Sequence, residues 1–405
     1  MQLNSLFVNL GGEILSKILF GMLMASSMTM AACASEDART ADLGEISEAL
    51  EGSAAVRSPV VVYVGSHDSG DPSTATGQIA VYALDPTTGA LTWTSAIARD
   101  DQNLLDHPTF LAFDRAHSRL FAVSENYFDP TPFQSAVSAF AVDRQSGALH
   151  FVNSRATGYS FSPFEFTLGA VHLTLDPTAS HLLVAIFDNG GGGGAVQTYP
   201  IDGSGSLGEK SQEVTVGAEP HELVFAPDSN SLLVPEKGAD RIESFSYDGA
   251  TGALTLRSDA AVTTQVGAGP RHLAFSGDAR FAYLVSESAA TLSVYRVANH
   301  QLVTPALQTL TTVPADVAHF DRARAAEVAI DAHGLVYVST RFDALQTDGT
   351  YLPLEGYITS YRPHGPDGSL SPVQATRVGK EPRHFSIDPT SRFLVVANQE
   401  SNSVV

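Results

Sequence analysis

The chain has 405 residues, 43% of them hydrophobic, which is enough to bury a large core, and it contains one cysteine, Cys33. Its 44 acidic residues outnumber the 23 basic ones, for a formal charge of −21. This balance argues against nucleic-acid binding, which needs clustered Lys and Arg to neutralise phosphates. A single cysteine also excludes an internal disulfide and a cysteine-based zinc site.

The first 33 residues have the layout of an export signal. Lys17 precedes the apolar run ILFGMLMASSMTMAA, and the polar segment ASEDART follows Cys33. A positive region, a short apolar region and small residues in this order are typical of a secretory signal peptide. Met30-Ala31-Ala32-Cys33 resembles a bacterial lipobox. We therefore expect cleavage before Cys33, lipid attachment to it, and a location in the periplasm or at the outer membrane or cell surface. Secretion without lipid is the alternative.

Residues 34–57 form a Ser-, Ala-, Glu- and Gly-rich segment that we interpret as a flexible linker, and residues 58–405 as one folded domain. The strand VVVYV at 60–64 opens this domain, and a second alternating strand follows at 78–84. It ends in the turn sequence DPTTGAL, which returns as DRQSGAL at 143–149 and DGATGAL at 248–254. Asp and Gly provide the side-chain-to-backbone bonds and positive φ values that tight hairpins need.

After these first strands, a strand-turn-strand unit occurs six times. The clearest copy is PRHLAFSGDARFAYLVSE, which starts at Pro270, and the copies begin 50 to 62 residues apart, at Pro108, Ala170, Pro220, Pro270, Ala325 and Pro382. Repeats of about 40–50 residues, each with four short strands, are typical of a β-propeller. With the N-terminal strands they predict an all-β, seven-bladed β-propeller of four-stranded antiparallel blades. The last copy reaches Val405 inside its third strand, so we expect the last blade to be incomplete and the sequence to be truncated.

The hairpin geometry of each repeat predicts where functional side chains gather. The first strand runs away from one face of the ring and the second returns to it. Arg271, at the start of strand one, should therefore lie beside Glu287, which ends strand two. Applied to all copies, this places a basic cluster at one mouth of the ring, namely His221, Arg271, Arg383, Lys237 and Arg341. Arginine offers a fork of donors matched to carboxylate or phosphate, so the cluster predicts an anionic or oxyanion-forming ligand. Glu287 and His221 are candidates for general acid–base chemistry.

One residue further along the inner strands, four polar side chains complete the candidate substrate-binding set with Arg383 and Lys237: His172, His272, Glu327 and His384. Bonding of backbone between blades is the alternative role for the three histidines. A plain cross-strand salt bridge is the alternative for Arg271 and Glu287. No short-spaced ligand motif supports a metal site, so we expect neither a metal nor an organic cofactor.

These motifs resemble those of the seven-bladed propeller lactonases, which include propeller-type 6-phosphogluconolactonases and the fungal carboxy-muconate lactonising enzyme. The resemblance runs from about Val60 to Val405 and rests on YVGS, LDPTTGALT, EPHELVFAPD, GADRIESFSY, GPRHLAFSGDARFAYLVSE and EPRHFSIDPTSRFLVVANQ. It implies that the catalytic set is His221, Arg271, Glu287 and Arg341. The chain departs from the family pattern in the turns at 277–280 and 234–236 and at His67, which leaves the substrate open.

The resemblance implies a lactone hydrolase, which is a carboxylic-ester hydrolase. His221, assisted by Glu287, would activate water or carry the proton. Arg271 and Arg341 would hold the substrate's acidic group and stabilise the oxyanion. The expected partner is a small lactone or an anionic sugar acid, and the expected state is a monomer that contacts a membrane only through lipid on Cys33. One alternative is a non-catalytic exported propeller that binds a protein or glycan. Another is a muconate cycloisomerase that uses the same residues.

Overall fold

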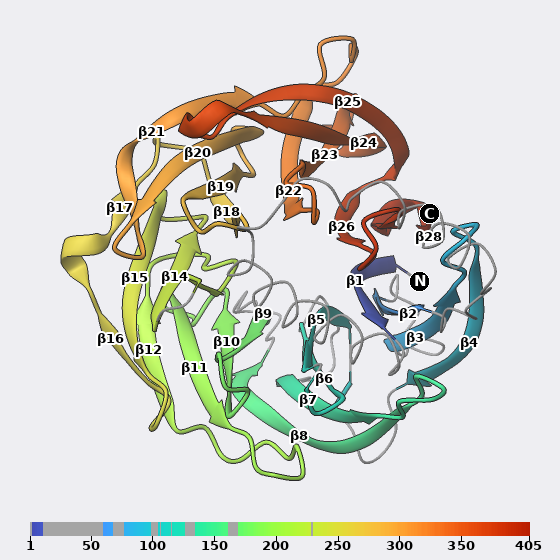
Figure 1. The fold of residues 1–405 in the computed structure, drawn as a ribbon, viewed down its shortest axis with the longest axis vertical. Coiled ribbons are helices and arrows are strands. Elements are labelled where there is room, and N and C mark those ends of the chain that lie inside the picture. The colour runs from blue at the N-terminus through green and yellow to red at the C-terminus, as the bar shows by residue number, and fades with distance from the viewer. Residues whose placement is uncertain are drawn as a thin grey trace, which may run out of the picture.

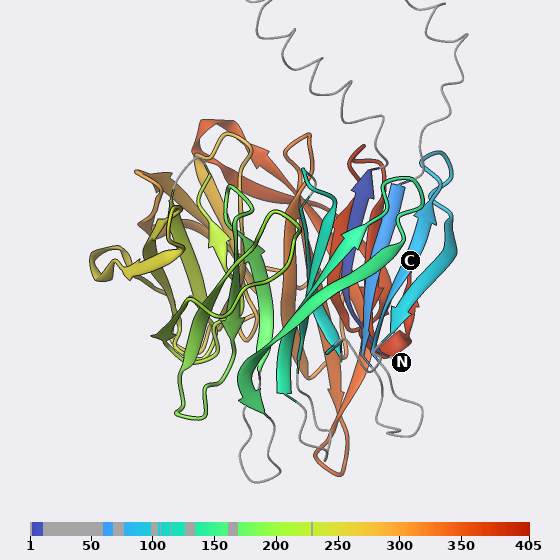
Figure 2. The same ribbon diagram turned by 90° about the horizontal axis from the view of Figure 1, so that it is seen from below.

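The computed structural model describes residues 2–10, 60–67, 77–98, 104–105, 107–114, 116–125, 134–160, 169–227 and 230–405. These residues form seven antiparallel sheets around a central axis, and within each sheet the strands follow chain order from the axis outward (Figure 1). Seen from the side, the strands run between the two faces of the ring (Figure 2). The predicted all-β, seven-bladed propeller is confirmed.

Each of the first three blades has four strands. The first contains β1 (Gln2–Leu10), β2 (Val60–His67), β3 (Gln78–Leu84) and β4 (Leu91–Ala98). The second contains β5 (Pro108–Asp114), β6 (Arg119–Ser124), β7 (Gln134–Val142) and β8 (Leu149–Ser160). The third contains β9 (Ala170–Leu175), β10 (His181–Ile186), β11 (Gly194–Pro200) and β12 (Gln212–Val216).

The remaining four blades differ slightly in strand number. The fourth contains β13 (Val224–Phe225), β14 (Ser231–Glu236), β15 (Arg241–Asp248), β16 (Ala253–Leu256) and β17 (Val262–Thr263). The fifth contains β18 (Pro270–Phe275), β19 (Phe281–Ser286), β20 (Thr291–Ala298) and β21 (Gln301–Thr311). The sixth contains β22 (Arg322–Ile330), β23 (Val336–Leu345), β24 (Tyr351–His364) and β25 (Ser369–Lys380). The last contains three strands, β26 (Pro382–Ile387), β27 (Leu394–Asn398) and β28 (Ser403–Val404), so the expected incomplete blade is present.

Helical structure in the described residues is limited to three single 3₁₀ turns, η2 (Ser258–Ala260), η3 (Gly365–Asp367) and η4 (Gln399–Ser401). Across the same residues, no helix is long and apolar enough to cross a membrane.

The first blade contains a strand that the repeats do not predict. β1 pairs with β2 from Gln2↔His67 to Leu10↔Val60 and takes the innermost position. Of the proposed signal region, 1–33, the structure describes this strand alone, and Cys33 and the linker at 34–57 lie outside the described residues. The export signal and the linker therefore stay predictions.

The hydrophobic core is divided into seven layers, one between each pair of neighbouring blades. Successive side chains of a strand point to opposite faces of its sheet, so alternate residues of β2 pack into two different layers. Val60, Val62 and Val64 pack against the last blade, whereas Val61 and Tyr63 pack against the second. Every middle strand is thus buried on both faces, which explains why VVVYV and FAYLV read as continuous apolar runs.

Close contacts between glycine and proline set the spacing of neighbouring blades. A Cβ atom on Gly194, in β11, would lie 2.2 Å from Cδ of Pro220, and one on Gly356, in β24, would lie 2.4 Å from Cδ of Pro382. Each proline opens the inner segment of the next blade. Only glycine allows such a close approach, so these pairs fix where the next inner segment begins.

The inner strands carry a β-bulge near their start, which directs side chains toward the ring axis. In the fifth blade the register passes from Pro270↔Ser286 to His272↔Val285, so Arg271 is an extra residue. Thr109 and Arg383 are extra residues in the same way. A bulge breaks strict alternation and re-aims the side chains beside it. Consecutive residues such as Arg271 and His272 can therefore both serve one site.

The fourth blade departs from the predicted strand at Pro220. Regular pairing is confined to β13, and an isolated bridge joins Pro220 to Glu236. The backbone N–H of Leu223 instead donates to Nδ1 of His172 in the neighbouring blade, at 3.2 Å. His221 and Glu222 therefore occupy an irregular segment whose geometry is set by contacts between blades.

Candidate active site

Two buried arginines share one carboxylate at the mouth of the ring. Oε2 of Glu287 lies 2.9 Å from Nε of Arg271 and 3.0 Å from Nη2 of Arg341. The Arg271–Glu287 contact expected from the hairpin is present. Arg271 is 2% exposed and Arg341 is 0% exposed, so neither cation has a water shell of its own.

The ion pairs continue into the sixth and seventh blades. Arg341 lies opposite Arg324 in the ladder between β22 and β23, an arrangement that would be repulsive on its own. Glu381 separates the two charges, because Oε1 binds Nη1 of Arg341 and Oε2 binds Nη2 of Arg324, each at 2.9 Å. Arg324 also reaches Asp343, 3.1 Å away. Alternating charges thus join three consecutive blades.

This network fixes the charge of its members. The pKa of Glu287 is strongly lowered, because the arginines at 341 and 271 outweigh the effect of its burial. Burial opposes the charge of Arg341, but Glu287 and Glu381 raise its pKa. Burial lowers the pKa of Arg271 to about 9, with Glu287 acting against this change. At neutral pH all three groups are therefore ionised, and Glu287 is too weakly basic to accept a proton.

A second chain of contacts consists of histidines and one carboxylate. Nε2 of His272 lies 3.3 Å from Nδ1 of His221, and Nδ1 of His272 lies 3.0 Å from Oε2 of Glu327. The same oxygen lies 3.2 Å from Nε2 of His384. Oε1 of Glu327 accepts the backbone N–H of Val328 at 3.0 Å. These side chains come from the fourth to the seventh blades.

The histidines are held in the neutral state. Burial is the main cause that lowers the pKa of His221 and of His272 well below the usual value, and the positive charge of Arg271 adds to it. Burial likewise lowers the pKa of His384 to about 4, against the attraction of Glu327. An uncharged imidazole keeps one ring nitrogen available as an acceptor at neutral pH, while burial and the adjacent cations lower its basicity.

The remaining predicted residues lie around this centre and differ in the contacts that hold their side chains. Nδ1 of His172 is occupied by the backbone of the next blade, which matches the structural alternative for that histidine. Nζ of Lys237 pairs with Glu219 at 2.7 Å. Arg383 is half-buried and makes no hydrogen bond or ion pair with the described residues, and its charge acts on His221 and Glu287.

The sequence interpretation missed three residues at this centre. Glu381 joins two arginines from a turn, and turns were not part of the hairpin map. The dipeptide Glu-Pro, found both at 219–220 and at 381–382, was a signal that could have revealed it. Glu222 and Phe110 occupy the position of His272 in their own repeats, so a full alignment of the copies would have found them. Phe110 packs on His172 with ring centroids 4.1 Å apart.

A cavity of about 570 Å³ lies between inner segments of the second, third, fourth, sixth and seventh blades, near the ring axis. Its polar lining includes His172, Glu222, Glu327 and His384, and most of the other lining residues are apolar. The described residues contain no group of three or more His, Cys, Asp or Glu side chains placed to hold a metal ion.

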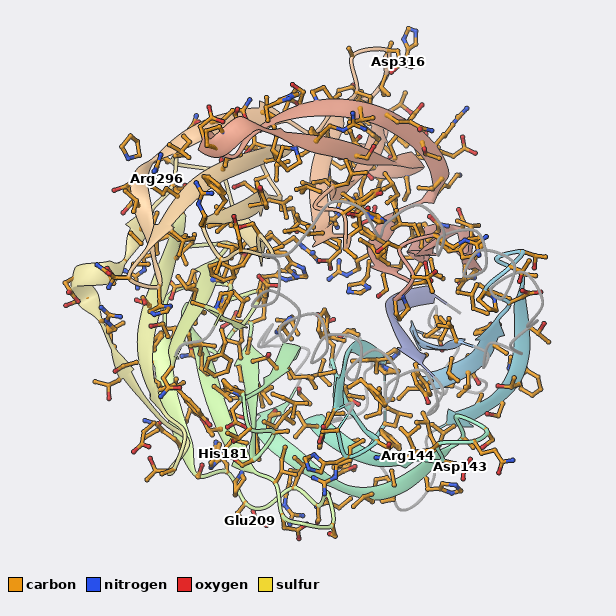
Figure 3. All side chains as sticks on the ribbon, viewed as in Figure 1. Asp143, Arg144, His181, Glu209, Arg296 and Asp316 are labelled. Carbon is orange, nitrogen blue, oxygen red and sulfur yellow. The ribbon has the colours of Figure 1, made fainter. Side chains whose placement is uncertain are left out.

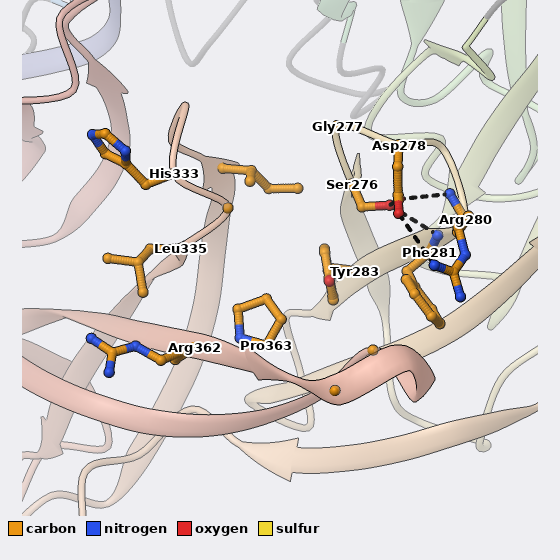
Figure 4. Close-up of a pocket in the computed structure, with 14 residues that line it drawn as sticks. Ser276, Gly277, Asp278, Arg280, Phe281, Tyr283, His333, Leu335, Arg362 and Pro363 are labelled. Atoms are coloured by element: carbon orange, nitrogen blue, oxygen red, sulfur yellow. Dashed lines mark hydrogen bonds and ion pairs between the residues drawn. The ribbon is translucent and has the colours of Figure 1, made fainter. Parts of the chain in front are cut away.

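The other charged regions lie away from this centre. Charged side chains such as Asp143, Arg144 and Arg296 lie around the outer rim (Figure 3). A second cavity, of about 490 Å³, lies between turns of the fifth and sixth blades on the opposite face (Figure 4). There Asp278 accepts bonds from its own turn, including the hydroxyl of Ser276 at 2.7 Å. Among the described residues, the axial mouth brings arginine N–H donors close to neutral imidazoles.

The chain is similar in sequence and fold to known proteins. Residues 61–405 match the family described as "Lactonase, 7-bladed beta-propeller". The chain is 30% identical over 241 residues to a 6-phosphogluconolactonase of Serratia proteamaculans, a match that covers 58% of this chain and 65% of that protein. The match therefore spans less than two thirds of the relative's length.

Two other similarities extend over most of the chain. A 6-phosphogluconolactonase of Bacillus subtilis is 25% identical over 356 residues, which covers 85% of this chain and 89% of that protein. The solved structure of a periplasmic gluconolactonase of Pseudomonas aeruginosa is 26% identical, with a TM-score of 0.70, covering 85% of this chain and 90% of the other.

Substitution of the shared carboxylate tests the ion network. Glu287→Gln leaves two buried arginines without their common partner, so we expect a loss of about 3–5 kcal/mol in unfolding free energy at pH 7. The folded-state pKa of Glu287 is lowered, so its contribution is complete above the unfolded pKa of about 4.3 and is lost as pH falls through the folded pKa. The difference between wild type and variant should therefore be smaller at pH 3 than at pH 7 in urea unfolding.

Glu219→Gln is the matched control on the same face. It removes the partially exposed pair with Lys237 and should cost less than about 1 kcal/mol. Equal losses for the two variants would contradict the special role assigned to Glu287.

Proposed function

Because the chain belongs to the seven-bladed β-propeller lactonase family, we propose that it hydrolyses a lactone at the axial mouth that His221 and Arg271 line. The observation that carries this proposal is a neutral histidine beside a buried, ionised arginine. Hydrolysis of a cyclic ester needs a base that activates water and a donor that stabilises the oxyanion. The names of the relatives, 6-phosphogluconolactonase and gluconolactonase, favour a sugar lactone as substrate.

His221 is the proposed general base. Nδ1 lies 3.3 Å from Nε2 of His272, and this is the side-chain hydrogen bond that His221 makes with the described residues. Its Nε2 takes a proton from water while the water oxygen adds to the lactone carbonyl carbon. When the tetrahedral intermediate collapses, the ring C–O bond breaks and the same nitrogen returns the proton to the leaving oxygen. The product is the open hydroxy acid, and no cofactor enters this balance.

Arg271 is the proposed donor to the oxyanion. Its Nε lies against Glu287, and Nη1 donates to the carbonyl of Ala326 at 2.6 Å. These two contacts fix the plane of the guanidinium, and Nη2 has no acceptor among the described residues. A donor held in place in this way stabilises developing negative charge without reorganising.

Arg341 and Glu287 have supporting roles in this proposal. Arg341 has no exposed surface, and its terminal nitrogens bind Glu287, Glu381 and the carbonyl of Ala325. We therefore assign it to the orientation of Glu287 rather than to substrate contact, which differs from the role that the family resemblance implies. Glu287, ionised at neutral pH, orients Arg271.

Arg383 is the proposed binding group for an acidic substituent such as a phosphate. It is the half-buried arginine of the mouth that no described carboxylate engages. Burial raises the pKa of Glu125, and the charge of Arg383 opposes this change. A guanidinium can bind phosphate with two parallel hydrogen bonds.

We also propose that the chain is exported and carries lipid on Cys33. The lipobox-like sequence and the similarity to a periplasmic gluconolactonase support this location. Cleavage before Cys33 would also remove β1 from the first blade.

Replacement of the base tests the catalytic assignment. His221→Ala should lower kcat/KM for sugar lactones by about 10²–10⁴-fold, measured above the spontaneous rate with phosphorylated and plain gluconolactones. His150→Ala, an exposed histidine of β8, is the control and should retain full activity. Turnover unchanged in His221→Ala would remove His221 from the mechanism. A wild-type protein that hydrolyses no sugar lactone would favour a binding function.

Substrate charge tests the role of Arg383. Arg383→Met should raise KM for the phosphorylated lactone by about 10-fold or more, because a hydrogen bond to a charged group contributes about 1.5–3 kcal/mol. KM for the uncharged lactone should change by less than about threefold. An equal rise in KM for both substrates would show that Arg383 does not recognise the phosphate.

Metabolic labelling tests the export proposal. Radiolabelled palmitate should be incorporated into the wild-type chain expressed in a bacterial host, and the mature mass should lack residues 1–32. Cys33→Ser should abolish the label. A wild-type chain that takes up no label would refute lipid attachment.

A further inference from the structure

We propose that Glu327 and His272 are positioning residues that set the tautomer of His221, so that its Nε2 is the basic nitrogen. This inference rests on the proposed role of His221 and extends it to a three-residue relay, Glu327–His272–His221. Three blades contribute one member each. The contacts are 3.0 Å between Glu327 and His272 and 3.3 Å between His272 and His221.

The relay begins with the protonation state of Glu327. Its Oε2 lies near Nδ1 of His272 and Nε2 of His384, while Oε1 accepts the N–H of Val328. An ionised carboxylate accepts all three bonds. A protonated carboxyl with its hydrogen on Oε2 would donate to one imidazole, whose facing nitrogen would then have to accept, and would accept from the other imidazole. The relay takes Glu327 as the ionised acceptor of both imidazole N–H groups.

The tautomers then follow one after another. A neutral imidazole carries one N–H, so the donor and acceptor nitrogens are linked. If Nδ1 of His272 donates to Glu327, its Nε2 has to accept. The nitrogen opposite, Nδ1 of His221, then has to donate, and Nε2 of His221 is left with a free lone pair. The carboxylate thus determines which nitrogen of a distant ring is basic.

The packing holds this order in place. His272 is 3% exposed and His221 is 6% exposed, so water does not compete for their facing nitrogens. The backbone N–H of His221 donates to the carbonyl of Pro235 at 2.9 Å, and Phe187 lies edge-on to its ring. Arg271 lies nearby, and its charge disfavours a second proton on either imidazole.

Glu222 provides an internal comparison. It occupies the position of Glu327 in its own repeat and lines the same axial cavity. Its Oε2 accepts the backbone N–H of Leu273 at 2.6 Å, and no imidazole contacts it in the described part of the chain. Glu222 therefore supplies a buried carboxyl without a relay.

The experiment reads the tautomer directly. Histidine labelled with ¹⁵N gives different shifts for protonated and unprotonated ring nitrogens, and the His221→Ala spectrum identifies the signals of His221. The wild type should have a hydrogen on Nδ1 of His221 and none on Nε2. In Glu327→Gln the amide N–H₂ can donate to His272, which reverses both tautomers. Nε2 of His221 should then be protonated, and kcat should fall by about 100-fold with KM changed less than about threefold.

Glu222→Gln is the matched comparison, and it should keep the wild-type tautomer of His221. A wild-type spectrum with the hydrogen on Nε2 of His221 would overturn the relay without any variant, even if Glu327→Gln failed to fold. An unchanged tautomer in Glu327→Gln, or the same reversal in Glu222→Gln, would also overturn it. The spectra do not depend on turnover, so a protein with no lactonase activity would refute the proposed function while leaving the relay open to the same measurement.

Discussion

The site depends on one carboxylate shared by two buried arginines. Among the described residues, Glu287 is the carboxylate that contacts Arg271, and it also binds Arg341, which Glu381 holds from the other side. Burying a guanidinium is expensive unless its charge is matched and its donors are bonded. The alternating order of charges matches both cations, and the contacts of Arg271 with Glu287 and with the carbonyl of Ala326 hold it in one orientation. The fifth, sixth and seventh blades are joined by the same contacts, so the integrity of the ring and the geometry of the mouth have a common cause.

Burial has a different consequence for the histidines beside this network, which are kept uncharged. Among the residues that the structure describes, no carboxylate contacts His221 directly, and burial together with the adjacent cations keeps its imidazole neutral. The arginines and the histidines thus have complementary roles. The paired cations keep their charge and offer donors, and the neutral rings keep a lone pair and offer an acceptor. Both are needed for the addition of water to a cyclic ester.

The sequence predicted the parts of this arrangement that follow from repetition. The six copies starting at Pro108 to Pro382, together with the N-terminal strands, are sufficient for the seven blades, and the hairpin geometry is sufficient for the contact between Arg271 and Glu287. It did not predict features set by irregular backbone. The sequence placed Arg271 and His272 in one candidate site, but a bulge leaves no compositional mark, so the sequence did not give the backbone geometry by which two consecutive residues can serve it. Glu381 acts from a turn with φ of 55°, outside the strand pattern. The pairing of His221 with His272 required knowing that the inner segment of the fourth blade is not a regular strand.

The contacts between glycine and proline have a consequence for how this mouth can change. Gly194 touches Pro220 and Gly356 touches Pro382 with no room for a side chain, and the residue after each proline belongs to the site. The spacing between the inner segments of neighbouring blades is therefore set by main-chain contacts, and substitution of side chains cannot widen it. A change toward larger or smaller substrates therefore has to occur through the side chains that each inner segment carries into the mouth. The outer strands, which lie farthest from these contacts, are free to vary without altering the spacing at the centre.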